Sequence, residues 1–346
     1  MQKRYLIVLI ICLAAATAYF YLGARRNYRD FAVIHNGNTV SIIAIDNRGA
    51  SLMDVDGDSI RRNKLLLAGD FSQCWAAYHK DRYVAALSSG NALSLVDTGG
   101  TIIDTLRLNN DRKIVDLCFY PSASQAEMLF IITGDSGEWY GDHIAGYSMT
   151  DRLNPVYSKD MADYSPWRIQ TADVDGDGAR EISIGVYKTA RLHPVMAKRP
   201  FIYCWDGEGL RPRWLGSRLS RPFTEYVFGD LDGDGKDEII AVEVLKDGQN
   251  IVQCYGWTGF GFQGLAEGVP AQAYEGIRAV DAGTAEGRGV LVRYRDGGSC
   301  GIRIFSYKDG KLEAVHSIEG IDALRFDGAG GRLFYLEKGS ISVSNL

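Results

Sequence analysis

Histidine, proline and closely spaced cysteines are scarce in this chain. Its 346 residues include 5 histidines, and these have neither metal-ligand spacing nor a neighbouring candidate nucleophile. No two cysteines show Cys-x-x-Cys spacing, so zinc sites, haem attachment and thioredoxin-type chemistry lack support. An odd number of cysteines follows the N-terminal segment, and we expect most of them to be small buried hydrophobic side chains. They are Cys74, Cys118, Cys204, Cys254 and Cys300.

Signals for catalysis and for nucleic-acid binding are also lacking. No Gly-rich phosphate loop follows a strand and opens a helix, and the segment GDSG at 134–137 is interpreted as a hairpin turn. The formal net charge of -5 does not favour nucleic acid as a partner. The sequence therefore predicts no catalytic residue, and it leaves open whether the protein is an enzyme.

One long uncharged run lies at the N-terminus. Residues 5–23 read YLIVLIICLAAATAYFYLG, with basic residues on both sides. This length is close to the roughly 20 residues that span a bilayer as a helix. The run predicts an uncleaved signal anchor over residues 1–26. Basic residues at both ends do not settle its orientation, so the placement of the rest of the chain outside the cytoplasm follows from the calcium loops described below. The alternative is a signal peptide cleaved near the small residues 16–18, which would give a secreted protein.

Glycine is abundant, and it marks the turns of a repeated hairpin. The chain has 40 glycines against 8 prolines. Similar hairpins begin at Phe201, Ile251 and Ile302, about 50 residues apart, and each is preceded by another pair of apolar strands. Four such strands make one blade. We therefore predict an all-β fold over residues 27–346, a β-propeller of four-stranded blades. The repeat length allows six to eight blades, and we favour seven.

The predicted closure of the ring involves both ends of this region. The C-terminal stretch supplies only three strands, in the segments IDALRF, RLFYLE and SISVSN. A propeller removes its exposed edge by completing such a blade with a strand from the other end of the chain. We expect that strand within residues 30–56.

Two acidic loops occupy equivalent places in two consecutive repeats, about 162–220 and 221–270. The first acidic loop, 173–181, reads DVDGDGARE, and the second, 230–238, reads DLDGDGKDE. Carboxylates at loop positions 1, 3, 5 and 9, with a main-chain carbonyl at position 7, match the hard oxygen ligands that Ca²⁺ requires. We predict two structural calcium sites. Their ligands are Asp173, Asp175, Asp177, Ala179 and Glu181, and Asp230, Asp232, Asp234, Lys236 and Glu238.

These loops differ from an EF-hand, which places its closing glutamate at position 12 and has flanking helices. Ile184 and Ala241 stand at position 12 here, and the residues after each loop read as strands. The loops resemble the FG-GAP and VCBS repeats of integrin α-subunit propellers and of many bacterial surface proteins. That resemblance is close over 167–262 and weak elsewhere. It implies a propeller with calcium in the loops joining the first two strands of certain blades.

Other segments depart from this pattern. The equivalent loops near Asp281 and Phe326 have lost their carboxylates. The segment DVDGDS at 54–59 resembles a third loop, but Arg62 stands at position 9 and the segment lies between apolar strands. We interpret it as a turn.

A basic insertion marks a candidate ligand-binding face. The connection 188–200 is much longer than its counterpart in the next repeat, and insertions in repeat proteins often map to the binding face. An anionic envelope polymer or an acidic partner surface is one hypothesis, and a solvated loop lying against lipid headgroups is the alternative. The candidate residues are Lys188, Arg191, Lys198, Arg199, Arg218 and Arg221.

The sequence thus favours a membrane-tethered propeller at the cell surface that binds a protein or polymer and is stabilised by calcium. A calcium-dependent hydrolase or lyase acting on an anionic substrate is the alternative, because some propellers gather acidic residues around the central channel.

Overall fold

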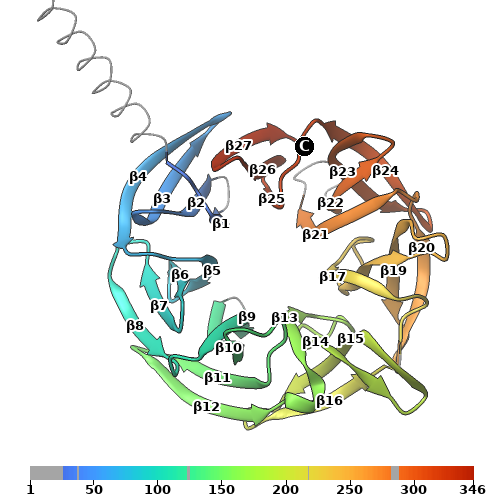
Figure 1. Cartoon of the computed structure of the whole chain (residues 1–346), viewed down its shortest axis with the longest axis horizontal. Helices are drawn as coiled ribbons and strands as arrows, with labels where there is room; N and C mark the ends of the chain where they lie inside the picture. Colours follow the sequence, from blue (N-terminus) through green and yellow to red (C-terminus); the bar gives the residue numbers. More distant parts are fainter. Residues whose placement is uncertain (1–25, 37–38, 123–124, 217, 282–287) are drawn as a thin grey trace, which may run out of the picture.

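The computed structural model describes residues 26–36, 39–122, 125–216, 218–281 and 288–346. These residues form seven antiparallel sheets arranged as blades around a central axis, which confirms the predicted seven-bladed propeller (Figure 1). Each of the first six blades has four strands, hydrogen-bonded in sequence order, and the innermost strand comes first in the chain. The predicted signal anchor lies outside the described residues, and among those residues no helix is long and apolar enough to cross a membrane.

The strands of the first four blades follow in chain order. Blade 1 contains β1 (Asp30–Asn36), β2 (Thr39–Asp46), β3 (Gly49–Asp56) and β4 (Ser59–Ala68). Blade 2 contains β5 (Gln73–His79), β6 (Arg82–Ser89), β7 (Ala92–Asp97) and β8 (Ile102–Arg107). Blade 3 contains β9 (Arg112–Ser122), β10 (Gln125–Asp135), β11 (His143–Met149) and β12 (Leu153–Asp160). Blade 4 follows the short 3₁₀ helix η1 (Ala162–Tyr164) and contains β13 (Pro166–Ala172), β14 (Glu181–Ala190), β15 (His193–Trp205) and β16 (Leu210–Leu215).

The remaining strands complete the ring. Blade 5 contains β17 (Phe223–Gly229), β18 (Glu238–Val244), β19 (Asn250–Trp257) and β20 (Phe262–Glu267). Blade 6 contains β21 (Ala273–Asp281), β22 (Arg288–Asp296), β23 (Ser299–Lys308) and β24 (Lys311–Glu319). Blade 7 contains β25 (Arg325–Ala329), β26 (Arg332–Glu337) and β27 (Ser340–Asn345).

The hydrophobic core lies between neighbouring blades. Second strands such as β14 and β18 are buried along most of their length, which explains their continuous apolar sequences. One cluster joins Ile240 and Val252 of blade 5 to Val292 and Phe305 of blade 6. Outer strands such as β24 face solvent with most of their residues. Each blade therefore buries its apolar faces only when both neighbours are present.

The predicted closure by a strand from 30–56 is wrong. All strands in that segment belong to blade 1, and blade 7 has three strands among the described residues. The sequence analysis overlooked β4, because its residues SIRRNKLLLA are mostly exposed and lack apolar alternation. With β4 present, the N-terminal segment forms a complete blade and has no strand to lend.

Side chains close the ring instead. Asp30 of β1 is buried, and its Oδ2 atom accepts hydrogen bonds from Arg325 Nη2 of β25 at 2.6 Å and from the Cys74 main-chain N–H of β5 at 3.0 Å. Phe31 and Ile42 of blade 1 pack in one cluster with Ala329 and Phe334 of blade 7. One carboxylate therefore connects blades 7, 1 and 2.

The antiparallel order gives the propeller two distinct faces. The acidic-loop face carries the connections between first and second strands, including the loops after β13 and β17. The hairpin face carries the connections between second and third strands, including the turn between β14 and β15, and the connections from one blade to the next. The DVDGDS segment is the tight turn between β3 and β4, as predicted.

Replacing Asp30 by asparagine should lower the free energy of unfolding by on the order of 2–3 kcal/mol, because the buried carboxylate that accepts from Arg325 and from the Cys74 N–H loses its charge. Urea denaturation followed by circular dichroism measures this change. Asp151→Asn is the control, since its carboxylate is fully exposed 3.6 Å from Lys80 and should change stability by less than about 0.5 kcal/mol. Equal losses in the two variants would contradict the proposed closure.

Candidate metal sites and central channel

The two acidic loops occupy equivalent positions in adjacent blades. The first joins β13 to β14 in blade 4, and the second joins β17 to β18 in blade 5, as predicted. Each loop turns at glycines with positive φ, among them Gly178 at 84° and Gly235 at 87°. An L side chain rarely adopts this conformation, so glycine at position 6 allows the sharp turn.

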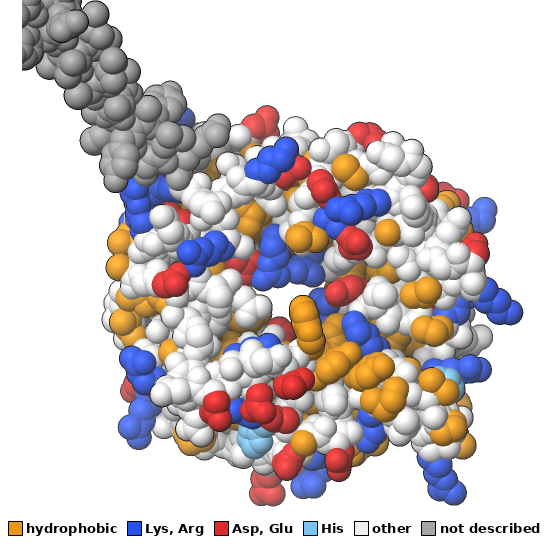
Figure 2. Space-filling model, in the orientation of Figure 1, with side chains coloured by type: hydrophobic (Ala, Val, Ile, Leu, Met, Phe, Trp, Pro, Cys, Tyr) orange, Lys and Arg blue, Asp and Glu red, His pale blue; other side chains and the backbone are white. Residues whose placement is uncertain are grey.

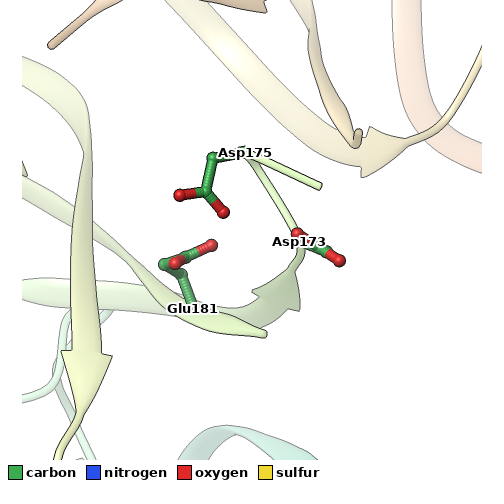
Figure 3. A group of neighbouring side chains, drawn as sticks. All are labelled: Asp173, Asp175 and Glu181. Atoms are coloured by element: carbon green, nitrogen blue, oxygen red, sulfur yellow. The ribbon is translucent and has the colours of Figure 1, made fainter. Parts of the chain in front are cut away.

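The first acidic loop brings three carboxylates together. Ligand atoms of Asp173, Asp175 and Glu181 lie within 4.8 Å of one another. Figure 3 shows the Asp175 and Glu181 carboxylates facing each other across the loop, with Asp173 at the end of β13. Burial raises the pKa of the Glu181 carboxyl, and the Asp175 Oδ1 atom is buried without a hydrogen-bond partner. An unpartnered buried oxygen beside two other carboxylates fits a cation ligand.

A protein cation already contacts this group. Arg213 of β16 donates a hydrogen bond to Glu181 Oε1 at 2.7 Å and pairs closely with Asp175. The guanidinium offsets the repulsion between the carboxylates, and it would compete with a metal ion for the same oxygens. Sequence analysis missed Arg213 because it is 32 residues from Glu181 and on the outermost strand of the blade.

The second acidic loop has a more exposed arrangement. Ligand atoms of Asp230, Asp232 and Asp234 lie within 4.8 Å of one another. Arg288 contacts Asp230 at 2.6 Å, and Lys236 contacts Asp234 at 3.0 Å. Each of these two basic side chains contacts one carboxylate. The first loop differs, because a single guanidinium contacts two of its three carboxylates.

The predicted ligands outside these three-carboxylate groups make local contacts. Glu238 accepts a hydrogen bond from the Leu231 main-chain N–H at 2.8 Å, and burial raises the pKa of its carboxyl to about 8. The Asp177 carboxylate accepts a hydrogen bond from the Ala179 main-chain N–H at 2.8 Å. The main-chain N–H of Lys236 bonds Asp234 in the same way, also at 2.8 Å.

Asp237 connects the two acidic loops, a role that sequence analysis did not predict. Its Oδ2 accepts hydrogen bonds from the Asp173 main-chain N–H at 2.8 Å and from Arg180 at 2.8 Å. Its own main-chain N–H donates to the Asp173 carbonyl at 2.7 Å. The second loop therefore holds the first loop at its opening residue, and any ion bound at either loop would stiffen the contact between blades 4 and 5.

Four of the six predicted ligand-binding cations have contacts within the chain. The ammonium of Lys188 lies 3.6 Å from the centre of the Tyr164 ring. Lys198 donates to the Thr224 carbonyl at 2.6 Å, and Arg199 is fully buried. Arg221 pairs with two glutamates, Glu243 at 3.0 Å and Glu267 at 2.7 Å. The remaining two, Arg191 and Arg218, have exposed side chains.

The central channel holds a set of charged side chains that sequence analysis did not anticipate. A cavity of about 1310 Å³ is lined by residues of the innermost strands, including Arg168, Arg278 and Arg325 together with Asp116, Glu225 and Asp327. Figure 2 shows Lys and Arg side chains gathered in the mouth of the channel, with hydrophobic side chains along its rim. In the sequence, these residues are single charges within the apolar first strands of the blades. The closed ring brings them together around one axis.

The charges in the channel differ in how they are paired. Arg168 contacts Glu225 at 2.5 Å. Asp116 accepts a hydrogen bond from the Ile169 main-chain N–H at 2.9 Å, and burial raises its carboxyl pKa. Arg278 donates to the Ile277 carbonyl at 2.8 Å, and burial lowers the pKa of its guanidinium. The channel can therefore present a cationic group to a ligand.

Comparison with solved structures agrees with this architecture. The chain is similar to the β-propeller domain of Cps50 (Swd1) from Myceliophteria thermophila, with a TM-score of 0.59 and 12% identity over 91% of this chain and 96% of that one. It is similar to the C-terminal WD40 domain of Sif2, with a TM-score of 0.57 and 11% identity over 93% and 96%. A putative 6-phosphogluconolactonase from Bacteroides uniformis has a TM-score of 0.53 and 15% identity over 84% and 85%.

No protein-family model matches the chain, and no curated protein matches its sequence. The similarity to solved structures supports the seven-bladed propeller, and WD40 propellers are among its structural neighbours. The resemblance to FG-GAP and VCBS repeats rests on the two acidic loops.

Arg213→Gln should strengthen calcium binding at the first acidic loop by at least about tenfold. A charge-assisted hydrogen bond contributes about 1.5–3 kcal/mol, and the variant removes this competitor of the ion. Isothermal titration calorimetry of the calcium-free protein measures both sites. Arg211→Gln is the matched control, because Arg211 lies on the same strand and contacts Asp206 at 2.5 Å instead. Unchanged affinity in Arg213→Gln would show that the guanidinium and the ion do not compete.

Proposed function

We propose that the protein is a membrane-tethered, extracytoplasmic propeller of the FG-GAP/VCBS type that acts as an interaction module and is stabilised by two calcium ions. The observation that carries the calcium assignment is the pair of three-carboxylate groups at equivalent connections of blades 4 and 5. The unpartnered Asp175 oxygen adds support, since a buried polar atom without a partner is costly.

Calcium would supply positive charge at the centre of each carboxylate group. The chain's own contribution is to hold the loops in a shape that fits this charge. Amide N–H groups of Gly176 and Gly178 fix the Asp173 carboxylate at 2.8 and 2.9 Å. The Asp237 contacts then transmit that order from one blade to the next. The role we assign to the metal is therefore structural.

The interaction role is supported by the fold. The WD40 domains among the structural neighbours share the architecture, and propellers commonly mediate protein interactions. The apolar residues 5–23 support a tether to the membrane, because their length suits a bilayer-spanning helix. A protein or a cell-envelope polymer is the class of partner we propose.

Calcium at a hundred times its dissociation constant should add about 2.7 kcal/mol per site, about 5.4 kcal/mol for the two sites together, and raise the melting temperature by about 8 °C. The double variant Asp175→Asn with Asp232→Asn should lose most of this increase, because each loop then lacks one anionic ligand. Differential scanning calorimetry in chelator and in calcium measures the difference.

Asp58→Asn, in the turn between β3 and β4, is the control for this measurement and should keep the full calcium response. A calcium response that persists in the double variant would exclude the two acidic loops as the stabilising sites.

A second candidate function is an enzyme that acts on an anionic substrate in the central channel. The convergence of Arg168, Arg278 and Arg325 with carboxylates in one cavity favours it, since pairs of acidic and basic groups can orient a substrate and move protons. The sequence analysis associated such an enzyme with acidic residues around the central channel, and Asp116, Glu225 and Asp327 line this cavity.

A screen of phosphate esters and acidic polysaccharides, with and without calcium, tests this candidate. An enzyme should show turnover that falls at least about 100-fold in Arg278→Met, as expected for loss of an electrostatic contact to the transition state. Arg218→Met, outside the channel, should retain activity. Absence of turnover throughout the screen, or equal activity in both variants, would reject Arg278 as a catalytic group.

A further inference from the structure

The hairpin of β14 and β15 projects beyond its counterpart in the next blade. Its strand pairing continues to Ala190 opposite His193, whereas the pairing of β18 and β19 ends at Val244 opposite Asn250. Apolar side chains are exposed at its tip. Leu192 is 85% exposed, and Val195 and Met196 are also exposed. Exposed apolar side chains that cluster on a projecting element are typical of a surface that contacts a membrane or another protein.

The tip of this hairpin is held in shape by a buried arginine. Arg199 is fully buried and donates hydrogen bonds to the carbonyls of Lys188 at 2.9 Å, His193 at 3.0 Å and Val195 at 2.8 Å. A guanidinium that satisfies three carbonyls of one turn keeps the turn ordered in the absence of a partner. The apolar side chains are therefore presented by a preformed loop, which lowers the entropy lost on binding.

A neighbouring loop extends the same surface. Tyr140, between β10 and β11, stacks on Tyr187 of β14 with ring centres 5.1 Å apart. Trp139, next to it in sequence, is 89% exposed. Tryptophan is favoured at the boundary between lipid and water because its ring is apolar and its N–H is polar. The hairpin face therefore carries exposed apolar side chains on both blade 3 and blade 4.

The chain enters the propeller on this same face. The Tyr28 main-chain N–H donates to the Gly339 carbonyl at 2.9 Å, and Gly339 lies in the turn between β26 and β27, a connection of the hairpin face. The apolar run ends at Gly23, and five residues reach at most about 18 Å. A bilayer-spanning helix over 5–23 would therefore keep the hairpin face of blade 1 close to the membrane.

We propose that the hairpin face lies on the surface of a lipid bilayer, with Leu192, Val195, Met196 and Trp139 inserted at the interface. This inference rests on the membrane tether of the proposed function. Blades 1 and 4 lie on opposite sides of the ring, so the tether and the hairpin provide two separated attachments that set the tilt of the disc (Figure 1).

The insertion is driven mainly by apolar contact. Arg191 at the tip is exposed and suits lipid phosphates, but Glu138 and Asp163 are exposed on the same face. These opposite charges offset the positive charge of Arg191 in this part of the face. A neutral phosphatidylcholine bilayer should therefore bind it, and anionic lipid should strengthen the contact only modestly.

A quenching experiment tests the proposal. Full-length Leu192→Trp and Phe260→Trp proteins are reconstituted into phosphatidylcholine vesicles whose acyl chains carry bromine, which quenches nearby indole fluorescence. Phe260 is the matched control, because it is 87% exposed but lies between β19 and β20 on the acidic-loop face. The fluorescence that Leu192→Trp adds to that of the unsubstituted protein should be quenched at least twofold more than the fluorescence that Phe260→Trp adds.

Vesicle flotation of the same samples separates this inference from the tether. Flotation without stronger quenching at residue 192 would overturn the docked face and leave the tether intact. Absence of flotation would reject both. Both substituted positions are highly exposed, and unchanged melting temperatures verify that the variants are folded.

Discussion

The propeller depends on the junction between blades 7 and 1, which closes the ring. Among the described residues, no strand of blade 1 pairs with blade 7. Each blade buries its apolar faces only against two neighbours, so an open junction would expose two core surfaces to water. The junction between blades 7 and 1 is held by the Asp30 carboxylate, which is shared by Arg325 and the Cys74 main-chain N–H, and by the apolar packing of Phe31 and Phe334. A three-stranded last blade is stable under this arrangement because its side chains, rather than its strand edge, meet blade 1.

On the opposite side of the ring, the acidic loops also use a shared carboxylate to connect neighbouring blades. Asp237 bonds the main chain at Asp173 and the Arg180 side chain, so the loop of blade 5 braces the loop of blade 4. The two loops share a sequence pattern but differ in their surroundings. Arg213 contacts two of the three carboxylates of the first loop, whereas Arg288 and Lys236 approach the rim of the second. Two loops of nearly identical sequence can therefore differ in metal affinity.

The two faces and the central channel carry different kinds of side chains. The acidic loops share one face, the projecting apolar hairpin and the chain entry share the other, and charged side chains of the innermost strands meet between them. This division follows from antiparallel connectivity, since alternate connections of a blade emerge at opposite ends of its strands. The acidic loops, the projecting hairpin and the channel therefore occupy separate parts of the molecule.

The sequence by itself determined the repeat, the strand pairs of blades 4 to 6 and the position of both acidic loops, and it favoured seven blades, because apolar alternation, glycine turns and carboxylate spacing are local signals. Only the tertiary structure decided the closure of the ring and the contacts of Arg213 and Asp237, since these residues meet partners that are distant in the chain or in another blade. Arg199 shows the same limit, because it reads as a surface cation in the insertion but is fully buried in the folded hairpin. The charges of the channel are each unremarkable in their own strands, and they form a site only because seven strands surround one axis.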